Sequence, residues 1–211
     1  MKNKKDKKNI KNFINYVSQE TKKAGIKFVL AKKKYLVIPE EGYIRCTGFF
    51  DENSSLLKCA TNRPTILWLG VLVHEYSHFE QWQKGLKIWE DVIINDKDVG
   101  TEISLWIKGK NLAQEKINDY IRRTRNLELD CERRTVKNIK KFKLPINIKD
   151  YIQGANAYIY FYNYVCLHRT WYKNTPPGET EEIVSTMPKN FNNRYNVLPK
   201  KYEVLYNKFL N

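Results

Sequence analysis

Apolar residues predict four helices in this chain. They recur at helical spacing over residues 10–23, and an apolar run begins after Pro64 and continues over residues 65–84. Two further amphipathic stretches cover about residues 111–141 and 150–172. Glycines follow the first two stretches and a proline follows the third, as expected at helix ends. The pattern therefore indicates a chain that is rich in helix.

Short β-prone runs separate the first two helices. Residues 27–39 are expected to form two short strands, and the polar cluster at residues 51–55 predicts the turn of a hairpin. Residues 86–110 mix short apolar runs with turn residues, and we expect an irregular excursion there. No repeat or flexible linker divides the chain. The prediction is one α+β domain over residues 1–211, with a short antiparallel or mixed sheet packed on the helix of residues 65–84 and two further long helices.

The chain has 211 residues and a formal net charge of +15. A charge of this size raises nucleic acid as a possible partner, because clustered cations release counterions from phosphates. The basic residues are mainly lysines and occur with many Asn, Ile and Tyr residues, so we do not favour that alternative. The one dense cluster lies in residues 1–8, which we expect to form a disordered basic tail.

The four cysteines are scattered, without a Cys-x-x-Cys pair. The N-terminus lacks a secretory apolar segment, and the apolar run of residues 66–73 is too short to cross a bilayer. We therefore expect reduced thiols in the cytoplasm of the producing or infected cell, and no membrane association. The sequence leaves the oligomeric state open.

The motif with the clearest chemistry is His74-Glu75-Tyr76-Ser77-His78. Residues four apart share one face of a helix, so His74 and His78 could bind one zinc ion. Glu75 lies beside that line, where its carboxylate could accept a proton from a zinc-activated water. The alternative is an ordinary pair of helix histidines. With so few histidines in the chain, and an apolar run directly before the motif, we favour the zinc site.

Two histidines leave zinc short of one protein ligand. The segment Arg125–Thr135 offers Glu128, Asp130 and Glu132. Apolar or small residues at 117, 120, 121, 124, 127, 131 and 135 form the stripe that should pack inward, and Glu128 and Glu132 border it. Asp130 falls near the opposite face. We therefore expect Glu128 to be the third ligand and Glu132 to orient an imidazole.

These residues resemble a known family. The motif at residues 74–78, followed by Glu128-Leu129-Asp130-Cys131-Glu132, is similar to the gluzincin zinc metallopeptidases, and also to small metallopeptidase-like proteins encoded by bacteriophages. The resemblance covers residues 63–135 and implies a zincin-like fold that hydrolyses peptide bonds. It implies His74, His78 and Glu128 as ligands and Glu75 as general base. Glu132 stands where the family often has Asp.

The resemblance also suggests where a peptide or protein substrate would bind. In such enzymes an edge strand before the zinc helix pairs with the extended substrate, and residues 56–62 would supply it through Leu57, Cys59 and Thr61. The alternative is a purely structural hairpin strand. A peptidase further needs a donor to the oxyanion, for which we consider Tyr158, Tyr162 and Arg169 and prefer His168. The competing function is a basic nucleic-acid-associated protein, such as one of a phage, with a structural or vestigial zinc site.

Overall fold

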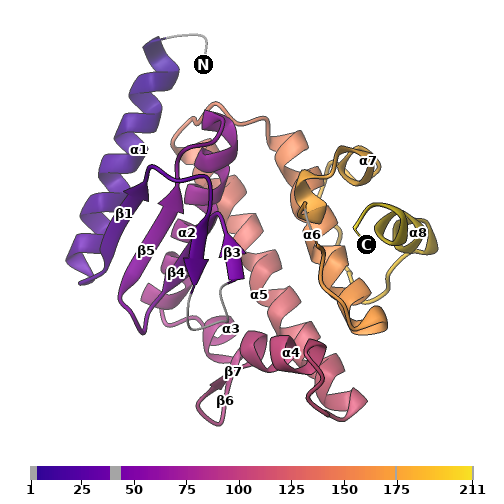
Figure 1. Ribbon diagram of the computed structural model, residues 1–211. Coiled ribbons are helices and arrows are strands. Elements are labelled where there is room, and N and C mark those ends of the chain that lie inside the picture. Colours follow the sequence, from indigo (N-terminus) through magenta and orange to yellow (C-terminus); the bar gives the residue numbers. More distant parts are fainter. Residues whose placement is uncertain (1–3, 39–43, 174, 211) are drawn as a thin grey trace. The chain divides into compact units, whose positions relative to one another are not determined.

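The computed structural model describes residues 4–38, 44–173 and 175–210 (Figure 1). The chain forms two compact units where the sequence pattern suggests one domain. The first contains Met1–Leu86 and Cys131–Ile146, and the second contains Lys87–Asp130 and Asn147–Asn211. Both units are assembled from separate segments, so no single linker marks the division.

The first unit begins with the expected helix and strands. Its elements are α1 (Lys4–Lys23), β1 (Lys27–Ala31), β2 (Leu36–Ile38), β3 (Ile44–Cys46), β4 (Gly48–Asp51), β5 (Leu56–Ala60) and α2 (Thr65–Gln83). The observed helix α1 is longer than the predicted one. It starts at Lys4, whereas its first buried residue, where the apolar pattern begins, is Ile10. Of the expected disordered tail, residues 4–8 are helical, and residues 1–3 lie outside the described part of the chain.

A three-stranded sheet in the order β1-β5-β4 forms the layer beneath α2. The central strand β5 runs parallel to β1, from Lys27 opposite Leu56 to Ala31 opposite Ala60. It runs antiparallel to β4 across the predicted turn, with Gly48 opposite Cys59. Strands β2 and β3 form a separate antiparallel pair.

Aromatic side chains join these elements into one core. Phe13 of α1 contacts Tyr76 of α2, with ring centroids 5.9 Å apart, and Phe142, with centroids 5.0 Å apart. Phe50 of β4 packs on Phe79 of α2. Burying each such ring contributes about 2 to 3 kcal/mol. The helix that carries the histidine motif is therefore fixed on both its sheet side and its α1 side.

The second unit is mostly helical. Its elements are α3 (Lys87–Glu90), β6 (Ile93–Ile94), β7 (Lys97–Asp98), α4 (Val99–Ile107), the first part of α5 (Gln114–Lys141), α6 (Ile148–His168), η2 (Pro177–Glu179), α7 (Glu181–Val184) and α8 (Lys200–Phe209). The last part of α5, from Cys131 onward, belongs to the first unit.

Two boundaries in this unit differ from the sequence prediction. The segment expected to be irregular contains α4, which Asp98 caps by accepting a hydrogen bond from the Thr101 backbone N–H at 2.7 Å. Helix α6 ends at His168 instead of Tyr172, because Arg169 adopts a left-handed conformation with φ of 51°.

The mixed helix and small sheets agree with the predicted α+β class. Among the residues that the structure describes, no helix has both the length and the apolar character needed to cross a membrane.

Candidate functional site

Helix α2 places the histidine motif in the interior of the first unit. Leu69, Leu72, Val73 and Phe79 are fully buried around it, which explains why this helix is apolar on nearly every side. His74 and His78 lie one turn apart, with ring centroids 4.7 Å apart and planes at 87°. His78 is buried, whereas the His74 side chain remains 22% exposed. The two imidazoles thus converge as the sequence spacing predicts.

The last part of α5 brings Cys131 and Glu132 to His74. Glu132 Oε1 lies 3.2 Å from His74 Nδ1. The Cys131 thiol lies 3.6 Å from the same nitrogen and donates to the His74 carbonyl at 3.3 Å. Burial alone would lower the pKa of His74, but the negative charge that Cys131 and Glu132 can carry outweighs it and holds this pKa well above its ordinary value.

His78 has an orienting partner of its own. Its Nδ1 lies 2.8 Å from Oε1 of Gln81, a fully buried side chain one turn later. An amide oxygen only accepts hydrogen bonds, so the proton of a neutral His78 ring resides on Nδ1. The Nε2 atom then carries the lone pair that a metal requires.

A group of three donors could hold a metal ion in this unit. Ligand atoms of His74, His78 and Cys131 all lie within 4.8 Å of one another. The sequence interpretation treated Cys131 only as a small residue of the inward stripe. Two features could have identified it: a thiolate is a common zinc ligand, and position 131 lies one turn after Glu128 on the same side of the helix.

Polar contacts hold α2 and α5 together beside this group. Thr135 donates to the hydroxyl of Ser77 at 3.0 Å, and Ser77 donates to the Val73 carbonyl at 2.8 Å. Asn138 donates to Glu80 at 2.8 Å. These side chains lie on successive turns of both helices, so they fix the height and rotation of α5 against the motif.

Glu75 points toward the sheet. A Cβ atom built at Gly48 of β4 would lie 3.0 Å from Glu75 Cγ and 2.5 Å from Val71 Cγ1. The backbone of β4 can therefore lie directly against α2 only because residue 48 is glycine. The carboxylate of Glu75 is buried at this contact, next to the histidines along the helix.

The predicted substrate strand is not an edge strand. Strand β5 is paired on both sides, and Leu57 and Cys59 are fully buried. The Thr61 hydroxyl is bound to the Ala31 carbonyl at 3.0 Å. The assignment of Leu57, Cys59 and Thr61 to substrate pairing is therefore wrong, because a strand with two neighbours has no free main-chain groups to offer. The sequence pattern did not reveal the parallel partner β1.

The other two predicted residues belong to the second unit. Glu128 lies in the first part of α5, so its role as a metal ligand stays a prediction. His168 ends α6, where its Nε2 lies 3.0 Å from Glu203 Oε1 and its ring stacks on Tyr164 at 4.4 Å. Its predicted role toward an oxyanion also stays a prediction.

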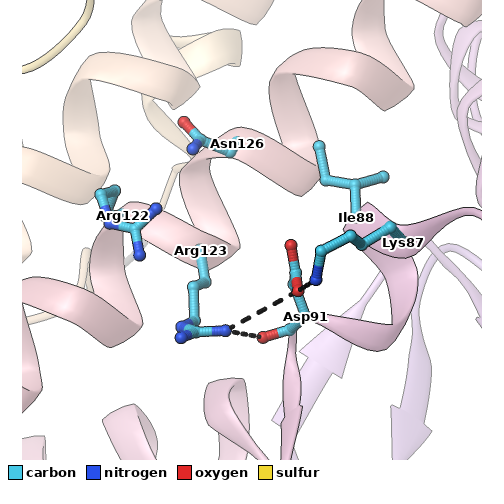
Figure 2. Close-up of a pocket in the computed structure, with 6 residues that line it drawn as sticks. All are labelled: Lys87, Ile88, Asp91, Arg122, Arg123 and Asn126. Carbon is cyan, nitrogen blue, oxygen red and sulfur yellow. Dashed lines mark hydrogen bonds and ion pairs between the residues drawn. The ribbon is translucent and has the colours of Figure 1, made fainter.

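The second unit contains a separate cavity of about 290 Å³, lined by Lys87, Ile88, Asp91, Arg122, Arg123 and Asn126 (Figure 2). Its cations are already engaged. Lys87 pairs with Asp91 at 2.6 Å and holds the pKa of that carboxyl below its ordinary value, and Arg123 donates to the Asp91 carbonyl at 2.9 Å. Arg122 and Arg123 both pair with Asp119. This cavity therefore lacks a donor set comparable to that of His74, His78 and Cys131.

The arrangement around the two histidines provides nitrogen and sulfur donors beside the buried carboxylate of Glu132. Such a set could hold a metal ion next to a group able to accept a proton. Comparison of the chain with protein-family models, with curated proteins and with solved structures found no match.

Proposed function

We propose that this protein is a zinc-dependent peptide hydrolase in which His74 and His78 bind the metal and Glu75 is the general base. The observation that carries the proposal is the convergence of two imidazoles from adjacent turns of α2 with an acidic partner on one of them. The contact between Glu132 and His74 Nδ1 is the kind that orients a ligating histidine and leaves its Nε2 free to bind.

The donors around the histidines fit zinc. Imidazole nitrogens and thiolates are ligands that zinc prefers, whereas magnesium and calcium prefer oxygen. The helical stripe and the gluzincin resemblance favour Glu128 as third ligand. Cys131 is a second candidate, because its sulfur already lies within 4.8 Å of both histidines. Variants of the two residues distinguish these assignments.

The residues of this chain would divide the reaction between them. When bound, zinc supplies a water of lowered pKa and polarises the scissile carbonyl. Glu75 accepts the proton of that water as the new carbon–oxygen bond forms. It then transfers the proton to the amine nitrogen as the carbon–nitrogen bond breaks. Burial of Glu75 against β4 restricts the motion of its side chain.

Strand β4 replaces β5 as the candidate for substrate pairing. Among the described residues, β4 pairs only with β5 and so presents its other edge. Its Gly48 lies against α2 at Glu75. A peptide that extended along this edge would gain main-chain hydrogen bonds from β4 close to the proposed base.

Metal analysis and one substitution test the proposal. The purified protein should contain about one zinc per chain, because the site combines several preferred ligands. Glu75→Gln should retain that zinc and lose peptide hydrolysis, since an amide keeps the shape but cannot accept the proton. Glu90→Gln, at an exposed position, is the matched control and should keep both properties. A protein that neither contains nor takes up zinc would overturn the proposal.

A further inference from the structure

A dense group of lysines lies at one end of the first unit. It comes from two segments that are far apart in the sequence, residues 4–11 of α1 and residues 137–143 at the end of α5. The lysines in both segments are exposed, and Asp6 is the one acidic residue that the two segments contain. We call these lysines the basic surface.

Specific contacts bring the two segments together. The Asn9 side chain donates to the Lys143 carbonyl at 2.9 Å. Tyr16 packs on Phe142 with ring centroids 4.8 Å apart, and Lys141 lies over the Tyr16 ring at 4.7 Å. The two groups of lysines therefore form one continuous patch on a rigid support, whereas the sequence alone suggested a disordered tail.

The lysines of this patch far outnumber the acidic residues among them, of which the two segments contain only Asp6. Within the part of the chain that the structure describes, Lys5, Lys8, Lys11, Lys140, Lys141 and Lys143 take part in no ion pair. Exposed lysines of like charge repel one another. A polyanion that binds here would therefore interact favourably with several of them at once.

We propose that the basic surface binds the phosphate backbone of duplex DNA. The eight residues of α1 that carry it extend over about 10 Å, so several lysines can reach neighbouring phosphates together. This activity is independent of the proposed hydrolysis. It would be insensitive to sequence, because flexible lysines on a helix surface contact phosphates rather than base edges.

Two other polyanions fit this surface less well. A helix that lies on an anionic membrane needs an apolar face to insert, and the apolar face of α1, which includes Phe13 and Val17, is buried in the core. Single-stranded nucleic acid requires aromatic rings for stacking. The nearby rings of Tyr16 and Phe142 already pack on each other.

The test compares two triple variants of the full-length protein. Lys5→Gln/Lys8→Gln/Lys140→Gln removes three charges in total from the basic surface, two from α1 and one from the end of α5. Lys32→Gln/Lys33→Gln/Lys34→Gln removes three exposed charges from the turn after β1 and is the matched control. The probe is a fluorescent duplex of about three helical turns, with affinity measured over a range of salt concentrations. Circular dichroism confirms that both variants are folded.

The wild-type protein and the control should bind this duplex with a strong and similar salt dependence. The basic-surface variant should bind at least about tenfold more weakly, and the slope of log K against log salt should fall by about one for each phosphate that the variant no longer neutralises. Equal losses in the two variants would show a nonspecific charge effect and overturn the proposal. So would binding to vesicles containing phosphatidylserine without binding to the duplex.

Discussion

Glu132 Oε1 lies 3.2 Å from Nδ1 of His74, across the contact between α5 and α2. This carboxylate can accept the Nδ1 proton and so set the tautomer and the tilt of the ring. Its role differs from that of a metal ligand, because it would act on affinity through the imidazole.

The first prediction concerns this partner. Glu132→Gln should lower zinc affinity about 10- to 100-fold without abolishing binding, since the amide can still contact the ring but carries no charge. Competition with a chromogenic chelator measures the change. Asp130→Asn, two positions earlier on the helix, is the control and should leave affinity nearly unchanged. An equal loss in both variants would mean that the effect is a general one of charge on α5.

The identity of the third ligand gives a second prediction. On the gluzincin pattern, Glu128→Ala should remove or sharply weaken zinc binding, by more than Glu132→Gln does. Cys131→Ser should then leave most of the affinity in place. The reverse order, with zinc lost from Cys131→Ser and kept by Glu128→Ala, would assign the third position to the thiolate. Cobalt substitution provides an independent reading, because a thiolate ligand adds a charge-transfer band in the near ultraviolet.

Gly48 supports a prediction about packing. A Cβ at this position would lie 2.5 Å from Val71 Cγ1, and the branched valine side chain cannot move away easily. Gly48→Ala should therefore destabilise the protein by about 1 to 3 kcal/mol, as overpacking typically does. Urea denaturation measures the loss. Ala31→Gly in β1 is the comparison for strand propensity. Gly109→Ala would not be a suitable control, because the φ of 115° at Gly109 is strained for alanine.

The order of alkylation of the cysteines gives a fourth prediction. Burial, with help from the negative charge of Glu75, raises the pKa of the Cys59 thiol to about 12. A higher pKa means less thiolate at a given pH, and the thiolate is the nucleophile. Iodoacetamide should therefore modify partly exposed Cys46 well before Cys59. Peptide mass spectrometry should show Cys59 labelling still increasing with pH above about 10, provided that the fold persists. Early labelling of Cys59 would show that β5 is not buried as described.

The N-terminal end of α1 should matter little to stability. Its first buried side chain is Ile10, so deletion of residues 1–8 removes none of the core side chains that the structure describes. Thermal unfolding should shift by no more than a few degrees, whereas a similar truncation through Phe13 should unfold the first unit. A large shift on deletion of residues 1–8 would mean that the lysine-bearing turns stabilise α1.

The sequence predicted the local elements of the first unit well because each has a clear local cause. Gly25 and Gly85 mark helix ends through their positive φ angles of 74° and 55°, and the polar turn before β5 produces the expected hairpin. The position of β5 between two strands could not be predicted, since its parallel partner β1 lies some thirty residues earlier in the chain. A local pattern does not encode such a pairing.

For the candidate site, helical periodicity placed Glu132 toward the histidines, and its contact with His74 agrees with that direction. Cys131 was not predicted as a donor because a cysteine in an apolar stripe looks the same whether it packs or binds metal. In the second unit, α4 was missed because it is only nine residues long, and so short an apolar stretch can be interpreted as strand or as helix. Its cap at Asp98 is a single local hydrogen bond.

The hydroxyl and amide contacts among Ser77, Thr135 and Asn138 have a consequence for how metal would enter. They hold α2 against α5 through groups that need no ion, so the imidazoles are arranged before any metal arrives. The entropy lost on ordering the ligand side chains is then part of the free energy of folding, and it does not reduce the affinity for metal. We therefore expect that a chelator would remove a bound ion, and that another ion could replace it, while the chain stays folded, in contrast to a zinc finger, whose fold depends on its metal.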